Sequence, residues 1–431
     1  MPFEPSTDLP RRIAIIGGGI SGMAAAYLLK DRHNVTLYEA EPRLGGHART
    51  VMAGKRGDQP VDTGFIVFNK VNYPHLVSLF DELDVPVTES NMSFGLSARG
   101  GRLEYGLADL RTVFAQRRNV ANPAFLRMLR DIVRFNKLAR DTVTPDMTIG
   151  ALIERLRLGA WFRDYYILPF SGAIWSTPCR GILDFPAEAL VRFFENHALL
   201  GYEGQHQWYT VQGGSVEYVR RLEAALTRAG VELRTGAPVA QVRRDAAGVH
   251  VDTHGAGSDH FDEVIFATHS DQALALLEKP TAPEREALGA VRYQPNHAVL
   301  HADASVMPRR RAVWSSWVYK EPQTGPADRI ALSYWMNSLQ PIPQDDPMFV
   351  TLNGGDGIDP GLIYDEVTFS HPVYDRAALR GQAQIRAMNG ANGTWFCGAW
   401  MRNGFHEDGF ASAVDVAEAM GQRDNTAVAA E

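Results

Sequence analysis

The sequence contains little cysteine and has no long apolar run. Its 431 residues include two cysteines, Cys179 and Cys397, which lie far apart in the chain, so a disulfide framework is not expected and a reducing compartment is favoured. Apolar segments are too short to cross a bilayer, and no apolar core of a signal peptide precedes the first expected strand. These absences predict a cytoplasmic protein, whose contact with a membrane is at most peripheral, at its inner face.

Two further absences exclude classes of function. His and Cys residues do not occur at spacings typical of metal sites, so no metal is expected. The net charge of −7, from 43 basic and 50 acidic residues, argues against nucleic acid as a partner. With 45% hydrophobic and 22% charged residues, the composition is that of a folded protein, and the length of 431 residues allows two or three domains.

A glycine-rich turn near the start of the chain predicts a dinucleotide site. The apolar run at residues 13–16 leads into Gly17, Gly19 and Gly22, and a helix with Ser21 at its start is expected to follow. These glycines permit the turn, the approach of a pyrophosphate and close helix–strand packing. A second strand, at residues 35–38, ends at Glu39, where a carboxylate can bind an adenosine ribose. Together these features predict a Rossmann-like nucleotide-binding unit.

The segment after Glu39 indicates which dinucleotide is bound. Arg43, Gly45, Gly46 and His47, with the Ala-Arg-Thr that follows, resemble the Arg-x-Gly-Gly-Arg-x-x-Thr segment of flavin amine oxidases and their relatives, including phytoene desaturases. The resemblance implies FAD, with this segment along the diphosphate and flavin. His47 stands where the family usually has arginine, which predicts a weaker or pH-dependent contact there.

The same resemblance implies further flavin-binding residues along the chain. Gly64 and Phe65 match a segment beside the isoalloxazine, and Val239 matches a valine at the adenine end. Residues 395–410 resemble the closing motif, in which a helix N-terminus faces the flavin and stabilises negative charge on it. That motif places Gly398, Asp408, Gly409 and Phe410 at the cofactor, and Asp408 is also expected to cap the last helix.

The order of strand and helix patterns predicts an interleaved arrangement. The fold class is α/β (α+β overall), with a Rossmann-like, amine-oxidase-like FAD-binding domain formed by residues 1–71, 205–290 and 390–431. Residues 72–204 and 291–389 are expected to form the substrate domain. Residues 249–251 and 263–268 are interpreted as a hairpin-like pair of strands.

A basic region near residues 110–140 stands out in the substrate domain. Ten Lys or Arg residues and three acids lie between Arg99 and Arg140, a local charge of +7 in an acidic chain. Arg127, Arg130, Arg134 and Lys137 recur at helical spacing with apolar residues between them. The pattern is typical of an amphipathic helix, either one that binds an anionic membrane or a core helix with solvated arginines.

Three residues are candidates for proton transfer. His301 lies six positions after Pro295, where the amine oxidase pattern has a lysine that holds a water beside flavin N5. His406 and Glu407 lie in the closing motif. All three residue types can hold or move protons, although a half-exposed strand histidine would explain His301 equally well.

A narrower resemblance suggests a substrate. The segments GGHART, VDTGF, AIWSTP, QWYTVQGGS and GFHEDG are similar to bacterial FAD-binding proteins encoded with lipid methyltransferases, some of which are fatty-acyl desaturases in the synthesis of furan fatty acids. The resemblance implies a desaturase that acts on a methyl-branched, unsaturated acyl chain of a membrane phospholipid, with O2 or another electron acceptor. It also makes a lipid methyltransferase a candidate partner. A flavin amine oxidase for a small amine or polyamine, a carotenoid-type desaturase and a non-catalytic flavoprotein are the alternatives.

Overall fold

A five-stranded parallel sheet forms the nucleotide-binding half of the molecule. The structure is a computed structural model that describes residues 10–175, 179–201, 205–321 and 330–428. Apolar residues on both faces of the sheet are buried, as is typical of parallel sheets covered on both sides. In spatial order the strands are β10 (Glu232–Arg234), β2 (Asn34–Tyr38), β1 (Arg12–Ile16), β14 (Glu263–Phe266) and β20 (Thr394–Phe396).

Different elements cover the two faces of this sheet. One face carries α1 (Ile20–Leu29), α10 (Val216–Arg228) and α15 (His406–Val428), with α2 (Pro74–Glu82) beside α15. The other face carries a three-stranded antiparallel sheet and three helices. These are β11 (Val239–Asp245), β12 (Gly248–Thr253), β13 (Ala256–Phe261), α11 (Ser270–Leu276), α12 (Ala282–Gly289) and α14 (Arg376–Met388).

The pairing of β12 corrects one expectation. The hairpin partner of β12 is β13, with Val251 opposite Asp259, and β14 instead pairs in parallel with β1. Residues 256–261 read Ala-Gly-Ser-Asp-His-Phe, so they lack the apolar alternation that identifies a strand from sequence. The predicted pairing of residues 249–251 with 263–268 was therefore wrong, because an intervening strand was missed.

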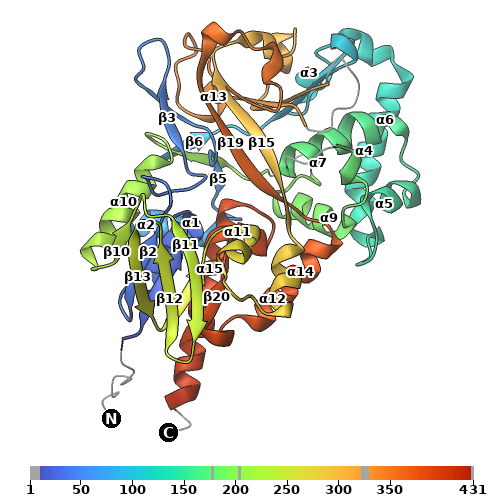
Figure 1. Cartoon of the computed structure of the whole chain (residues 1–431). Helices are drawn as coiled ribbons and strands as arrows, with labels where there is room; N and C mark the ends of the chain where they lie inside the picture. The colour runs from blue at the N-terminus through green and yellow to red at the C-terminus, as the bar shows by residue number, and fades with distance from the viewer. Residues whose placement is uncertain (1–9, 176–178, 202–204, 322–329, 429–431) are drawn as a thin grey trace, which may run out of the picture.

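A seven-stranded, mainly antiparallel sheet forms the second half. Two long strands, β15 (Arg292–His301) and β19 (Ile363–Val373), run from beside the nucleotide-binding half into this sheet (Figure 1). Next to them lie β18 (Phe349–Leu352), β17 (Leu332–Trp335), β16 (Trp317–Lys320), β7 (Phe94–Ala98) and β8 (Leu103–Gly106). Strands β16 and β7 pair in parallel, and the other neighbours are antiparallel.

The predicted α/β class with a Rossmann-like sheet and an interleaved second unit is confirmed. Residues 1–71, 205–290 and 390–431 supply all strands of the parallel sheet, and residues 72–204 and 291–389 supply those of the seven-stranded sheet. Two smaller sheets join the halves. They contain β3 (Thr50–Ala53) and β4 (Gln59–Asp62), and β5 (Phe68–Asn69), β9 (Trp208–Val211) and β6 (Val87–Ser90), with α13 (Met336–Leu339) nearby.

A group of helices forms one side of the second half (Figure 1). The longest is α4 (Pro123–Thr142), whose side chains Phe125, Met128, Ile132 and Phe135 are buried at helical spacing. The others are α3 (Leu110–Val113), α5 (Ile149–Arg155), α6 (Ala160–Phe162), the π-helical turn η3 (Arg163–Ile167), α7 (Leu168–Trp175), α8 (Cys179–Ile182) and α9 (Ala187–Asn196). The predicted helix in the basic region is therefore present.

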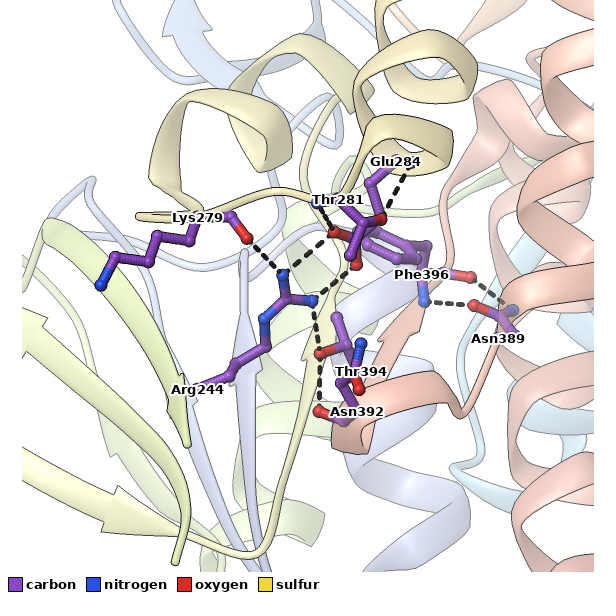
Figure 2. A network of polar contacts seen from close by, with 8 residues as sticks. All are labelled: Arg244, Lys279, Thr281, Glu284, Asn389, Asn392, Thr394 and Phe396. Atoms are coloured by element: carbon purple, nitrogen blue, oxygen red, sulfur yellow. Dashed lines mark hydrogen bonds and ion pairs between the residues drawn. The ribbon is translucent and has the colours of Figure 1, made fainter. Parts of the chain in front are cut away.

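A buried polar network joins elements at the edge of the parallel sheet (Figure 2). The guanidinium of Arg244 on β11 donates to both carboxylate oxygens of Glu284 on α12, at 2.6 and 3.0 Å, and to the hydroxyl of Thr394 on β20 at 3.2 Å. The side chains of Arg244 and Glu284 are 10% and 5% exposed. This ion pair therefore connects the three-stranded sheet, α12 and the last strand of the parallel sheet.

Candidate active site

The glycines after β1 form a turn that other residues could not adopt. Gly17 has φ +108°, and a Cβ on Gly22 would lie 1.8 Å from the carbonyl oxygen of Gly17. Helix α1 therefore begins directly against the end of β1, because these glycines have no side chains. The N-terminus of α1 faces the space beyond the carboxyl end of the sheet, where such helices bind phosphate.

Gly45 and Gly46 pack against the glycine turn that follows β1. Gly45 donates its N–H to the carbonyl of Gly18 at 2.8 Å, and a Cβ on Gly46 would lie 3.1 Å from the Cα of Gly19. Arg43 donates to the carbonyl of Gly46 at 3.1 Å. Backbone of the two segments thus meets without intervening side chains, an arrangement that fits a dinucleotide diphosphate and that we call the glycine groove.

Glu39 lies at the other end of this groove. Its Oε2 atom accepts the N–H of Gly18 at 2.6 Å, and its Oε1 atom accepts the N–H of Glu41 at 2.8 Å. The backbone of Glu39 also accepts the N–H of Ala237 at 2.9 Å, two residues before Val239 begins β11. Glu39 and Val239, predicted from separate motifs, therefore belong to one neighbourhood, as the ribose and adenine ends of one nucleotide require.

Gly64 and Phe65 pack against His47. A Cβ on Gly64 would lie 2.0 Å from the carbonyl oxygen of His47, and the Phe65 N–H donates to the same oxygen at 2.9 Å. The Phe65 ring stacks on the His406 ring with centroids 4.0 Å apart. The segment after β4 and the start of α15 thus meet beside His47.

The closing motif brings α15 to the same place. Gly398 has φ +153°, and a Cβ on Gly409 would lie 2.8 Å from the Oγ atom of Ser21, so the starts of α15 and α1 are in contact. Phe410 is buried in the core beneath them. Asp408 lies at the third position of α15 and accepts the N–H of Phe405 at 2.9 Å, so it closes the helix start from inside rather than as the N-cap residue. Burial raises the pKa of Asp408 to about 6.

His406 is held by a tyrosine. Its Nε2 atom lies 2.6 Å from the hydroxyl of Tyr218 on α10. Burial, and secondarily the nearby His47, lower the pKa of His406 to about 3, so the ring is neutral. The structure brings His406 together with His47 and Phe65, two of the predicted flavin-binding residues.

Glu407 and His301 have other surroundings. Glu407 accepts the N–H groups of His75 and Leu76 at 2.9 and 3.0 Å, so it caps α2, and burial raises its pKa to about 7. His301 is fully buried, its Nε2 atom lies 2.8 Å from Thr351 Oγ1, and its Nδ1 atom accepts the N–H of Asp303. Both carboxylate oxygens of Glu407 and both ring nitrogens of His301 are thus engaged in structural contacts.

The register of β15 separates His301 from the other candidates. Asn296 pairs with Phe369, whose ring stacks on His47 at 4.7 Å, whereas His301 pairs with Ile363. Five residues of strand correspond to roughly 17 Å. The structure therefore does not bring His301 to the site around His47.

Two histidines that were not predicted lie at this site. The rings of His269 and His371 lie 6.1 and 5.7 Å from the ring of His47, and Tyr293 stacks on His269 at 4.3 Å. These residues come from the segment after β14, from β19 and from β15, so their proximity is a product of tertiary structure. The one sequence signal was that His269 follows Ala-Thr at the end of an expected strand.

Comparisons with known proteins identify the family. The model for "Flavin containing amine oxidoreductase" matches residues 20–311. Protoporphyrinogen oxidase 2 of Arabidopsis thaliana is 56% identical over 43 residues, which cover 10% of this chain and 8% of that enzyme. An L-amino-acid oxidase of Bothrops jararacussu is 43% identical over 53 residues, 12% of this chain and 11% of that enzyme. The alignments thus span about a tenth of these curated relatives.

Solved structures share the fold over nearly the whole chain. A fatty acid isomerase from P. acnes has a TM-score of 0.69 at 14% identity, covering 95% of this chain and 98% of that one. Cyclohexylamine oxidase from Brevibacterium oxydans has a TM-score of 0.67 at 16% identity, covering 96% and 100%. The glycine groove, Glu39 and the start of α15 fit the nucleotide that the family model implies. The chain therefore belongs to the flavin-containing amine oxidoreductase family, and its cofactor is FAD.

Proposed function

We propose that this FAD-dependent oxidoreductase is an acyl desaturase that works at the surface of an anionic membrane. Its substrate would be an unsaturated, methyl-branched acyl chain of a phospholipid. The observation that carries the proposal is the surface around α4, where basic and apolar side chains are exposed together. The fatty acid isomerase from P. acnes shares this fold, which is compatible with a fatty-acyl substrate.

The basic side chains of this region lie at the surface. All ten Lys and Arg residues between Arg99 and Arg140 are exposed. Two of the three acids in the same range are buried, since Glu104 is 0% and Asp131 is 2% exposed, and Asp109 alone of the three is at the surface. The exposed charged side chains of this range are therefore almost all basic, which suits anionic lipid headgroups.

Exposed apolar side chains accompany the charges. Leu110, Val120, Leu126 and Val133 are 76%, 57%, 43% and 50% exposed. On α4, Leu126 and Val133 lie one heptad apart, next to the basic stripe of Arg127, Arg130, Arg134 and Lys137. Large apolar groups beside basic groups can enter the boundary between headgroups and acyl chains. No helix within the described part of the chain has the length and apolar character needed to cross a membrane.

The proposed chemistry removes two hydrogens from adjacent positions of the acyl chain. FAD supplies a hydride acceptor when bound. The protein must position an allylic C–H toward that acceptor, exclude water and take up a proton from the chain. His406 remains our candidate for the proton, because it is neutral and stacks on Phe65. His301 and Glu407 are not part of the proposal, since both are held in structural contacts. An electron acceptor such as O2 completes each turnover.

An anaerobic titration of the holoenzyme tests the proposal. Liposomes with methyl-branched, monounsaturated acyl chains should bleach the visible band of the bound flavin, and liposomes with saturated chains should not. Putrescine and cyclohexylamine serve as comparison substrates. Bleaching by the amines but not by the lipid would replace the proposal with an amine oxidase, the alternative that the sequence also allows. Absence of bleaching by all of these compounds would contradict both.

A further inference from the structure

Three histidine rings form a compact group next to the glycine groove. His269 and His371 lie within 6.1 and 5.7 Å of His47, which directly follows Gly46 in the groove. All three rings are partly buried. Within the described residues, no group of three or more His, Cys, Asp or Glu side chains is placed to hold a metal ion. The group therefore requires another explanation, which its hydrogen bonds provide.

A chain of fixed donors determines the tautomer of His371. The backbone N–H of His297 can only donate, and it donates to Asn353 Oδ1 at 3.0 Å. This contact orients the amide of Asn353, whose Nδ2 atom donates to Asn296 Oδ1 at 2.7 Å. Asn296 must then donate from Nδ2 to Nδ1 of His371, at 3.1 Å. The Nδ1 atom is an acceptor, so the proton of the neutral ring is on Nε2.

Helix α11 and Tyr293 hold His269 in place. His269 is the N-cap residue of α11, and its backbone N–H donates to Oε1 of Gln272 at 3.2 Å. A neutral ring carries one N–H group, so His269 has one ring nitrogen that can donate. Tyr293 stacks on the ring and accepts the N–H of Ser270 at 2.8 Å, which further restricts the position of His269.

Both rings have nitrogen atoms without a partner. Among the described residues the His371 ring makes no hydrogen bond besides that with Asn296, the His269 ring makes none, and no nitrogen of either ring belongs to the buried, unpartnered polar atoms. Burial lowers the pKa values of His269 and His371 to about 4 and about 3. Each ring is therefore neutral with one N–H group, and His371 cannot act as a base while Asn296 occupies its acceptor nitrogen.

We propose that His371, whose tautomer is fixed, and the neighbouring neutral ring of His269 are N–H donors that bind one hydrogen-bond acceptor group beside His47. Asn296 and Asn353 act as positioning residues for His371. The acceptor is an oxygen or nitrogen atom of the bound FAD or of the substrate. The inference rests on the family's cofactor and on the geometry of this group, and it does not depend on the proposed acyl substrate.

The tautomers can be measured directly. Long-range 1H–15N spectra of protein labelled with 15N-histidine distinguish a proton on Nε2 from one on Nδ1, and the His371→Asn variant assigns the His371 signals. At neutral pH, His371 should be neutral with its proton on Nε2. In Asn296→Asp the carboxylate accepts from the ring, so the proton should move to Nδ1. A wild-type ring that is protonated, or that carries its proton on Nδ1, would overturn the proposal.

Ligand binding identifies the acceptor. His371→Phe and His269→Phe each remove one neutral hydrogen bond, which predicts a loss of affinity of about threefold to tenfold. A loss in FAD affinity places the acceptor on the cofactor, whereas unchanged FAD affinity with a raised KM places it on the substrate. Asparagine at position 371 should restore part of the loss, because it supplies an N–H. His260→Asn, on β13 and outside this hydrogen-bond chain, is the control. Unchanged FAD affinity and KM in both phenylalanine variants would contradict the proposal.

Discussion

At the scale of single residues, His47 links the cofactor groove to acid sensitivity. Burial, with the nearby His269 and Arg43 as smaller causes, lowers the pKa of His47 to about 4, whereas the unfolded chain has a value of about 6.5. The unfolded state therefore binds a proton first as the pH falls. The stability that this neutral ring contributes is complete above about pH 6.5 and is lost as the pH falls toward 4.

His47→Asn should remove this loss. Between pH 7.5 and pH 5 the free energy of unfolding of the wild-type protein should fall by about 2 kcal/mol more than that of the variant. This value follows from the difference between the folded and unfolded pKa values of His47. Urea unfolding at both pH values, with FAD in excess, measures the difference. The exposed His254 provides the control, since His254→Asn should retain the wild-type pH dependence. Parallel behaviour of His47→Asn and the wild type would show that the ring does not resist protonation.

At the scale of elements, helix α4 should control membrane binding. Arg127, Arg134 and Lys137 are exposed and make no ion pair with the described residues. Replacing all three by glutamine should weaken the free energy of binding to anionic vesicles by about 3 kcal/mol at low salt. This corresponds to a decrease of roughly a hundredfold in the partition coefficient. Vesicle co-sedimentation over a salt series measures it.

The control for α4 changes the same charge elsewhere. Arg32, Arg228 and Arg380 are also exposed, and their replacement by glutamine lowers the net charge equally. If both triple variants lose the same affinity, the whole molecule rather than α4 determines the binding, and the assigned surface is wrong.

Elements with local signals were predictable, and those that depend on distant pairing were not. The glycine turn, Glu39 and α4 were identified because their spacing reflects one turn or one helix face. Strand β13 was missed because its residues have no apolar alternation. His371 lies on β19, which pairs with β15, and His269 lies after β14 and meets β15 through Tyr293, so their proximity depends on contacts between distant segments. His301 was predicted to lie at the site because it follows Pro295 by six positions. Sequence spacing alone cannot show that β15 extends past the site.

At the scale of the whole molecule, the Arg244–Glu284 pair should be important for stability. Arg244→Met would leave Glu284 buried without its partner, at a cost of about 3–5 kcal/mol in the free energy of unfolding. Arg244→Met combined with Glu284→Gln should regain part of this stability, since glutamine is neutral and can keep the capping box with Thr281. Chemical denaturation compares the variants. If the free energy of unfolding of Arg244→Met is within 1 kcal/mol of the wild-type value, the network in Figure 2 contributes little to stability.

The late position of β20 in the chain has a consequence for biosynthesis. This strand and α15 come after residue 393, yet β20 pairs with β14, and α15 packs against α1 near the other end of the sequence. Contacts so distant in sequence slow folding, because a long loop must close before they form. The cofactor groove stays incomplete on the ribosome until the last segment has emerged. We therefore expect FAD to bind after this segment has been translated, and a cell short of riboflavin to accumulate apoprotein rather than stalled fragments.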